Sequence, residues 1–157
     1  MQNALRFSND RFNHIEVKEN YKNDHCHGED LARWLCGELD TRGCPTLSID
    51  QEDWGWLCHV ACGENSYALM FGWISAPDNH WQIVTERNVG FWKRLFGSSE
   101  RGNVEEITTI INEIVRSGTD NTHIRWLRID SSGNESEENE LLNVCRQVTT
   151  DEERIEN

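Results

Sequence analysis

Apolar and polar residues alternate along residues 52–86, and this period of two predicts consecutive antiparallel strands. Turn-forming residues interrupt the alternation at 63–65 and again at 76–79. The strands are therefore expected at residues 54–62, 67–75 and 81–85. Both faces of the first two strands are apolar, so we expect this meander to be covered on both sides, which is compatible with a homodimer.

Two segments repeat their apolar residues at helical spacing and predict amphipathic helices. The first is residues 29–41, where leucine and tryptophan side chains form one stripe and Gly43 follows as a stop signal. The second is residues 103–117, where isoleucine and valine form the stripe. Asn103 is the expected N-cap of this helix, with Glu106 in the capping-box position.

Shorter strands are expected at residues 46–50 and 122–129, and a short edge strand at residues 11–18. Trp54 and Trp56 are both expected in the core. Helices that bracket a run of strands predict an α+β fold, with two main helices packed on a mostly antiparallel sheet of about four to six strands.

The chain is strongly acidic, with a formal net charge of −13, and its C-terminal end holds nine acidic and two basic residues. Such a field repels phosphates, so direct binding to nucleic acid is not expected. The charge suits a protein partner with a basic surface, or it serves solubility alone. The expected parts of the chain are an irregular segment at 1–28, a single α+β domain at 29–129, and an acidic tail at 130–157 that forms a short helix or is disordered.

The sequence contains neither a secretory signal nor a stretch long and apolar enough to span a membrane, so we expect a cytoplasmic protein. The six cysteines are then expected to be free thiols. Cys58 and Cys62 share one face of a strand but lie about 13 Å apart, so they cannot bond to each other. Cys58 and His59 project to opposite faces, so they cannot act as nucleophile and base.

His25, Cys26 and His27 are the candidate metal ligands, because neighbouring histidine and cysteine side chains on a loop can bind zinc. Their spacing matches no known zinc motif, so we expect no cofactor and keep zinc as the alternative. Glu52 and Asp53 could serve as acid and base. A turn whose carboxylates cap backbone amides is the commoner explanation.

Phe91, Trp92, Lys93 and Arg94 form the segment most suggestive of an interface, because aromatic and arginine side chains dominate protein–protein contacts. The alternative is a connector whose aromatic residues cap the end of the sheet. The acidic side chains expected to face a basic partner are Glu52, Asp53, Glu137, Glu138 and Glu140.

Residues 28–35 (GEDLARWL) and 52–56 (EDWGW) occur together with RLFG at 94–97 and with Arg125-Trp126. This combination resembles a group of small bacterial proteins that pair a GED-type helix start with an EDWGW strand and end in an RLFG–helix–strand segment. The resemblance covers roughly residues 24–128. It implies a bacterial, single-domain protein and no particular activity.

These observations favour a small acidic cytoplasmic protein, not an enzyme, that binds and inhibits another protein in the manner of toxin-immunity or phage anti-defence proteins. Two alternatives stay open. One is a small-molecule or metal-binding domain whose pocket lies over the Trp-rich sheet and is closed by residues 88–102. The other is a structural subunit of a larger assembly.

Overall fold

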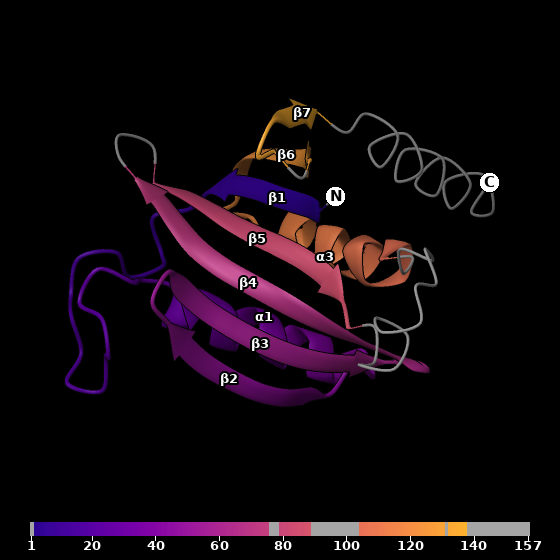
Figure 1. Ribbon diagram of the computed structural model, residues 1–157, viewed down its shortest axis with the longest axis horizontal. Coiled ribbons are helices and arrows are strands. Elements are labelled where there is room, and N and C mark those ends of the chain that lie inside the picture. The colour runs from indigo at the N-terminus through magenta and orange to yellow at the C-terminus, as the bar shows by residue number, and fades with distance from the viewer. Residues whose placement is uncertain (1, 76–78, 89–103, 131, 138–157) are drawn as a thin grey trace.

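The computed structural model describes residues 2–75, 79–88, 104–130 and 132–137, which form one antiparallel sheet with two helices on one of its faces (Figure 1). The elements are β1 (Gln2–Ser8), α1 (Glu29–Thr41), β2 (Thr46–Glu52), β3 (Gly55–Cys62), β4 (Asn65–Ser75), β5 (His80–Arg87), α3 (Glu105–Ser117), β6 (Thr122–Ile129) and β7 (Glu135–Glu137). The strands lie in the order β2-β3-β4-β5-β1-β6-β7. The predicted α+β class is confirmed, with more strands than expected.

Strands β3, β4 and β5 form the predicted three-strand meander, and β2, predicted as a separate short strand, extends it by pairing antiparallel with β3. Trp56 of β3 pairs with Phe71 of β4, and Phe71 pairs with Ile83 of β5. All three side chains are buried on the face that the helices cover. The apolar alternation in the sequence thus places every second side chain of the meander in the core.

Strand β1 lies in the middle of the sheet, between β5 and β6, and is antiparallel to both. Leu5 pairs with Ile83 on one side and with Trp126 on the other, and all three side chains are buried. The prediction of an irregular segment before α1 is therefore wrong for β1. Its apolar alternation is short, with Leu5 and Phe7 on the core face and Arg6 on the opposite face. There Arg6 forms an ion pair with Glu135 of β7.

Residues 11–18, predicted as a short edge strand, form an irregular loop instead. The side chain of Asn13 explains the difference, because its Oδ1 accepts hydrogen bonds from the backbone amides of Ile15 (3.1 Å) and Glu16 (2.9 Å). These bonds hold the chain in a turn and withdraw both amides from strand pairing. Ile15 and Val17 are exposed as a result.

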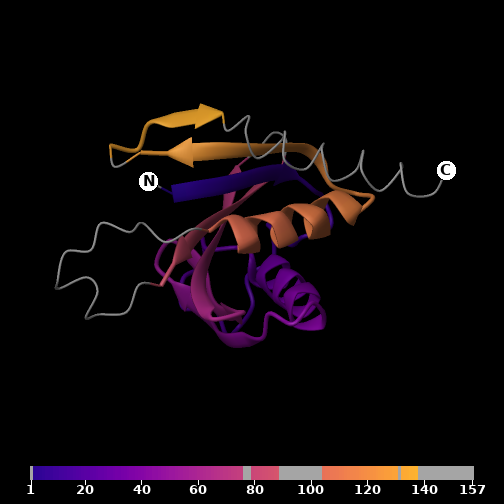
Figure 2. The same cartoon turned by 90° about the vertical axis from the view of Figure 1, so that its right-hand side faces the viewer.

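The two helices pack their predicted apolar stripes against the same face of the sheet (Figure 2). Helix α1 has the predicted bounds. Helix α3 begins at Glu105, and its N-cap residue, Val104, makes no side-chain capping bond. Asn103, the predicted cap, lies outside the described residues. Neither α1 nor α3 is long and apolar enough to cross a membrane.

The opposite face of the sheet carries a small apolar cluster of Ala4, Val84 and Leu127, bordered by Met70 and Ile129. Both helices lie on the other side of the sheet (Figure 1). We expected both faces of the meander to be covered. In the described part of the chain, the helices cover one face and no element covers the other.

Cys44 and Cys62 are joined in a disulfide, which corrects the expectation that all cysteines are free thiols. Cys44 follows α1, and the turn that returns the chain into β2 brings it to the end of β3, with 4.4 Å between the two Cα atoms. Cys26, Cys36 and Cys58 are free and buried. Spacing along β3 excluded a bond between Cys58 and Cys62, but spacing could not reveal a partner contributed by another element.

Part of the predicted acidic tail is ordered in the sheet, because β7 pairs antiparallel with β6 along one edge. All three residues of β7 are exposed. The rest of the tail, with its predicted short helix, lies outside the described residues. So does most of the loop expected to close a pocket, at residues 88–102.

Candidate functional site

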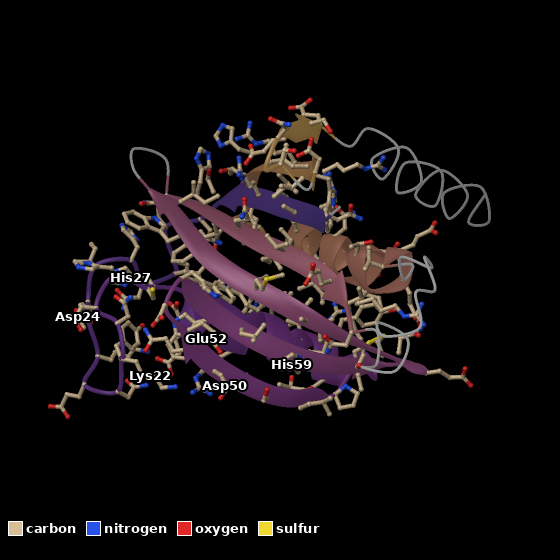
Figure 3. The ribbon with its side chains drawn as sticks, viewed as in Figure 1. Lys22, Asp24, His27, Asp50, Glu52 and His59 are labelled. Carbon is tan, nitrogen blue, oxygen red and sulfur yellow. A yellow bond between two sulfur atoms is a disulfide. The ribbon has the colours of Figure 1, made fainter. Side chains whose placement is uncertain are left out.

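The loop between β1 and α1 folds against the two-residue turn that joins β2 to β3, and we call this contact the loop–turn junction (residues 22–26 with 51–54). Two loop side chains hold the turn by its backbone. Asn23 Nδ2 and Cys26 Sγ both donate hydrogen bonds to the carbonyl oxygen of Asp53, each at 3.1 Å. Figure 3 shows Lys22 and Asp24 of the loop at the same end of the sheet as Glu52.

Gln51 fixes the loop from the other direction. Its buried side-chain amide accepts a hydrogen bond from the backbone amide of Lys22 and donates one to the carbonyl of Asn23 at 3.0 Å. Trp56 Nε1 adds a bond of 2.9 Å to the carbonyl of Cys26. The loop backbone is thus held by the last residues of β2 and the first residues of β3, so the junction is ordered without secondary structure of its own.

Glu29, the first residue of α1, anchors the loop to the helix. Its carboxylate is buried and accepts hydrogen bonds from Lys18 Nζ (2.9 Å) and Arg33 Nε (3.0 Å). Burial acts to raise the pKa of Glu29, but the bonds from Lys18 and Arg33 outweigh it and leave the pKa below its ordinary value. The carboxylate therefore stays charged at neutral pH and joins the loop to the helix by an ion pair.

The turn between β2 and β3 exposes Trp54 and buries Trp56. Trp54 is 52% exposed, whereas Trp56 is 4% exposed. The prediction that both tryptophans lie in the core is therefore wrong for Trp54. This residue lies in the turn before β3, so the alternation of that strand does not direct its side chain into the core. Gly55 between the two tryptophans allows the backbone of β4 to approach closely. A Cβ atom at this residue would lie 2.2 Å from the carbonyl oxygen of Phe71.

Exposed carboxylates lie at this end of the sheet. Asp53 directly precedes Trp54 in the turn, Glu52 and Asp50 lie on β2, and Asp24 lies on the loop. Lys22 is the exposed basic residue among them. The junction therefore presents one large aromatic side chain within a mostly negative surface.

The residues predicted to bind a partner do not form one continuous surface. Glu52 and Asp53 lie at the loop–turn junction on edge strand β2, whereas Glu137 lies on β7 at the opposite edge of the sheet. The remaining candidates, Phe91, Trp92, Lys93, Arg94, Glu138 and Glu140, lie outside the described residues. Of the predicted set, Glu52 and Asp53 are the pair that the structure brings next to an exposed aromatic residue.

The three candidate zinc ligands have different surroundings. His25 is exposed, and the thiol of Cys26 donates a hydrogen bond to the carbonyl oxygen of Asp53. His27 is buried between two aromatic rings, with centroid distances of 6.3 Å to Tyr21 and 6.1 Å to Trp73. Within the residues that the structure describes, no three His, Cys, Asp or Glu side chains gather in a way that would hold a metal ion.

Burial lowers the pKa of His27, and the nearby imidazole of His14 lowers it further. His14 stacks on the same tryptophan, Trp73, with a centroid distance of 5.4 Å. A neutral His27 suits this apolar site, which closes the end of the core beneath the loop. Sequence spacing placed His27 among metal ligands, but its contacts are those of a core residue.

A cavity of about 260 Å³ lies on the helix side of the molecule, between α1 and the turn that follows α3. Trp34 and Glu38 line it from α1, and Thr119 and Asn121 line it from the turn. The Arg11 guanidinium also lines it and lies 5.2 Å from the centroid of the Trp34 ring. This cavity differs in place from the pocket expected over the Trp-rich sheet, and no motif in the sequence indicated it.

The fold is thus a two-layer α+β arrangement, and the junction presents the exposed side chain of Trp54 on a turn held by hydrogen bonds. Comparison of the chain with protein-family models, with curated proteins and with solved structures finds no match.

Proposed function

We propose that this protein is a non-enzymatic binding protein that docks the loop–turn junction onto a basic surface of another protein and blocks it. Toxin-immunity and phage anti-defence proteins are inhibitors of this kind, and the resemblance to small bacterial proteins suits such a role in the bacterial cytoplasm. The observation that carries the proposal is Trp54, a half-exposed tryptophan on a turn that the loop holds in place.

A fixed tryptophan is an effective anchor for an interface. Tryptophan is among the residues that contribute most when buried between proteins, and it does so best in a preformed position that needs no ordering on binding. The hydrogen bonds to Asp53 and the close contact of Gly55 supply that order. The backbone of the turn therefore loses little conformational entropy when a partner covers Trp54.

The surrounding charge selects the partner. Asp24, Asp50, Glu52 and Asp53 are exposed on the loop, on β2 and on the turn that holds Trp54, and the whole chain carries a net charge of −13. Such a surface attracts a basic protein, speeds their encounter at low ionic strength and repels nucleic acid. A nuclease or another protein with a basic nucleic-acid-binding surface has the complementary chemistry.

The test is a capture experiment with matched variants. Tagged wild-type protein is used as bait in lysate of its native host or of a competing strain, at low and at moderate salt, and bound proteins are identified by mass spectrometry. One stoichiometric partner that is lost at moderate salt and lost with Trp54→Ala supports the proposal. Leu47→Ala is the control, because Leu47 is also exposed on β2 but lies at the other end of that strand. Equal capture by both variants contradicts the proposed surface.

The compartment is tested separately. Disulfides are more typical of oxidising compartments than of the cytoplasm, and Cys44 and Cys62 are bonded here. Alkylating the thiols in intact cells before lysis shows whether this pair is reduced. A reduced pair supports the cytoplasmic location, and an oxidised pair contradicts it.

The cavity beside Arg11 supports a second candidate, a small-molecule binding protein. The guanidinium and the Trp34 ring offer a cation and an aromatic surface to an anionic ligand of small size. Thermal-shift screening against small carboxylates and phosphates tests it, with Arg11→Gln as the variant that removes the charge. Metal analysis of the purified protein covers the zinc alternative, where stoichiometric zinc that is lost with His25→Ala and His27→Ala would favour a metal site.

A further inference from the structure

The cavity between α1 and the turn that follows α3 has a floor that the protein holds in place by its own hydrogen bonds. The buried side chain of Asn9, directly after β1, donates a hydrogen bond from Nδ2 to Oδ1 of Asn121. Asn121 Nδ2 in turn donates to the carbonyl oxygen of Val115 at 2.8 Å. Both asparagines line the cavity, so the end of β1 and the last turn of α3 are tied together beside it.

Arg11 supplies this cavity with a positive charge. Its guanidinium lies 5.0 Å from the ring centroid of Phe12 and 5.2 Å from that of Trp34. Its backbone amide donates to Asn9 Oδ1 at 2.7 Å, which fixes the chain at this residue. Among the described residues, the Arg11 side chain belongs to no ion pair. The planar fork of N–H donors is thus available to the two oxygens of a carboxylate.

The turn after α3 supplies the opposite charge. Asp120 is exposed and lines the cavity, and its carboxylate accepts a hydrogen bond from Thr119 at 3.4 Å. Within the described part of the chain, it pairs with no basic side chain. Glu38 adds a second carboxylate on the α1 side, where Arg42 pairs with it at 2.8 Å. The carboxyl end of α3 lies at the same turn, and the helix dipole favours a positive group there.

A cavity lined by both charges favours a ligand that carries both. An anion alone would attract Arg11 but would be repelled by Asp120 and Glu38, and an amine alone would have the reverse difficulty. Trp34 and Ile114 add apolar wall between the charged groups. The volume of about 260 Å³ lies below the range of about 300–1,000 Å³ that is typical of drug-sized ligands. The ligand is therefore small, zwitterionic and partly apolar.

We propose, building on the second candidate function, that this cavity binds a free α-amino acid with an apolar side chain. The carboxylate of the amino acid accepts hydrogen bonds from Arg11, and its ammonium group faces Asp120 at the end of α3. The apolar side chain packs on the ring of Trp34. Because the floor is fixed by Asn9 and Asn121 before the ligand arrives, little of the binding energy is lost to ordering the site.

Isothermal titration calorimetry on the full chain tests the ligand class with matched probes. L-leucine and L-phenylalanine carry both charged groups. Isocaproate and hydrocinnamate are the same molecules without the amino group, and isoamylamine and phenethylamine are the same molecules without the carboxylate. We expect at least one amino acid to bind about 10-fold or more tightly than both of its analogues, because each analogue loses one charge-assisted contact.

Two variants show which end of the cavity holds which group. In Arg11→Gln the amino acid should bind no better than the amine, since its carboxylate has lost its partner. In Asp120→Asn it should bind no better than the carboxylate analogue. Arg125→Gln and Glu113→Gln are the controls, because they remove the same charges from exposed residues outside the cavity lining. Both controls should keep the wild-type preference for the amino acid.

The outcomes separate this proposal from the function on which it rests. Binding of an analogue as tightly as its amino acid overturns the zwitterionic class. If neither amino acid binds, but a small carboxylate or phosphate raises the Tm in the thermal-shift screen, the ligand class is wrong and small-molecule binding stands. If no probe binds in either experiment, both are overturned. The comparison of probes on the wild-type chain decides the matter even if a variant fails to fold.

Discussion

The thiol of Cys26 donates a hydrogen bond to the backbone carbonyl of Asp53, with 3.1 Å between sulfur and oxygen. The two residues lie 27 positions apart in the chain, and the sequence indicated them for different reasons, one as a metal ligand and the other as a carboxylate facing a partner. Their contact makes the loop and the turn one unit. A change in the loop should therefore alter the position of Trp54, although no loop residue is next to it in sequence.

Gly55→Ala should strongly destabilise the protein. The added methyl group would lie 2.2 Å from the carbonyl oxygen of Phe71, so strands β3 and β4 would have to separate. We expect a loss of more than about 2 kcal/mol in the free energy of unfolding, measured by urea denaturation. Gly37→Ala in α1 is the matched control, because no heavy atom lies within 4 Å of its added Cβ. It should stabilise the protein by about 0.5–1 kcal/mol, and similar effects of the two variants would refute the packing argument.

Glu29→Gln should destabilise the protein at neutral pH and have less effect in acid. The amide cannot form ion pairs with Lys18 and Arg33, and we expect a loss of about 2 kcal/mol at pH 7. The folded-state pKa of Glu29 lies below its ordinary value of 4.5, so its stabilisation is present above pH 4.5 and is lost as pH falls through the folded pKa.

Urea unfolding of wild type and Glu29→Gln at several pH values between 7 and 3 measures this difference. The gap between the two free energies of unfolding should narrow as pH falls below 4.5. Glu38→Gln is the control, because Glu38 pairs with Arg42 at the surface of the same helix and exposed pairs contribute little. A gap that stays constant across the pH range would show that the ionised carboxylate is not the source of the stabilisation.

The sequence predicted those parts of the fold that depend on local periodicity. Helix α1 has the predicted bounds, and the three central strands of the meander lie where the alternation placed them. Strand β1 was missed, because its alternation on the core face covers only Leu5 and Phe7 and its partners, β5 and β6, are far along the chain. Pairing of β1 with β5 on one side and β6 on the other stabilises it as a strand more than its own composition does.

The candidate site was harder to predict than the fold, for a physical reason. The loop–turn junction is held by backbone carbonyls of Asn23, Cys26 and Asp53, and carbonyls leave no trace in the sequence. Trp54 looked like a core residue because it shares the alternation of β3, yet it precedes the first residue of that strand. Gly55 between the tryptophans is the available signal in the sequence, since a glycine within a strand pattern often marks a close approach of another backbone.

His27 should make the stability of the protein depend on pH below its ordinary pKa of 6.5. Its folded-state pKa is below the ordinary value of 6.5, so the unfolded chain takes up the proton first. The free energy of unfolding therefore falls as pH drops from 6.5 through the folded pKa. His27→Gln removes this contribution and should flatten the slope, as followed by tryptophan fluorescence in urea. A slope that stays unchanged in His27→Gln would contradict this assignment.

Removing charge at the loop–turn junction should slow the binding of a basic partner. Under the proposed function, the double variant Glu52→Gln, Asp53→Asn lowers the association rate constant by about 10-fold at low salt and reduces its salt dependence. The dissociation rate should change less, because exposed charges steer the encounter more than they hold the complex. Trp54→Ala should have the opposite signature, a faster dissociation with little change in association, since the indole acts after contact.

Glu137→Gln supplies the control for this charge effect. Glu137 is an exposed carboxylate on β7, at the opposite edge of the sheet from β2. Its replacement makes the net charge of the protein less negative and leaves the loop–turn junction unchanged. Surface plasmon resonance against the captured partner, at two salt concentrations, separates the two cases. If Glu137→Gln slows association as much as a single change at Glu52, the partner responds to the overall charge of the protein, and the loop–turn junction is not the docking surface.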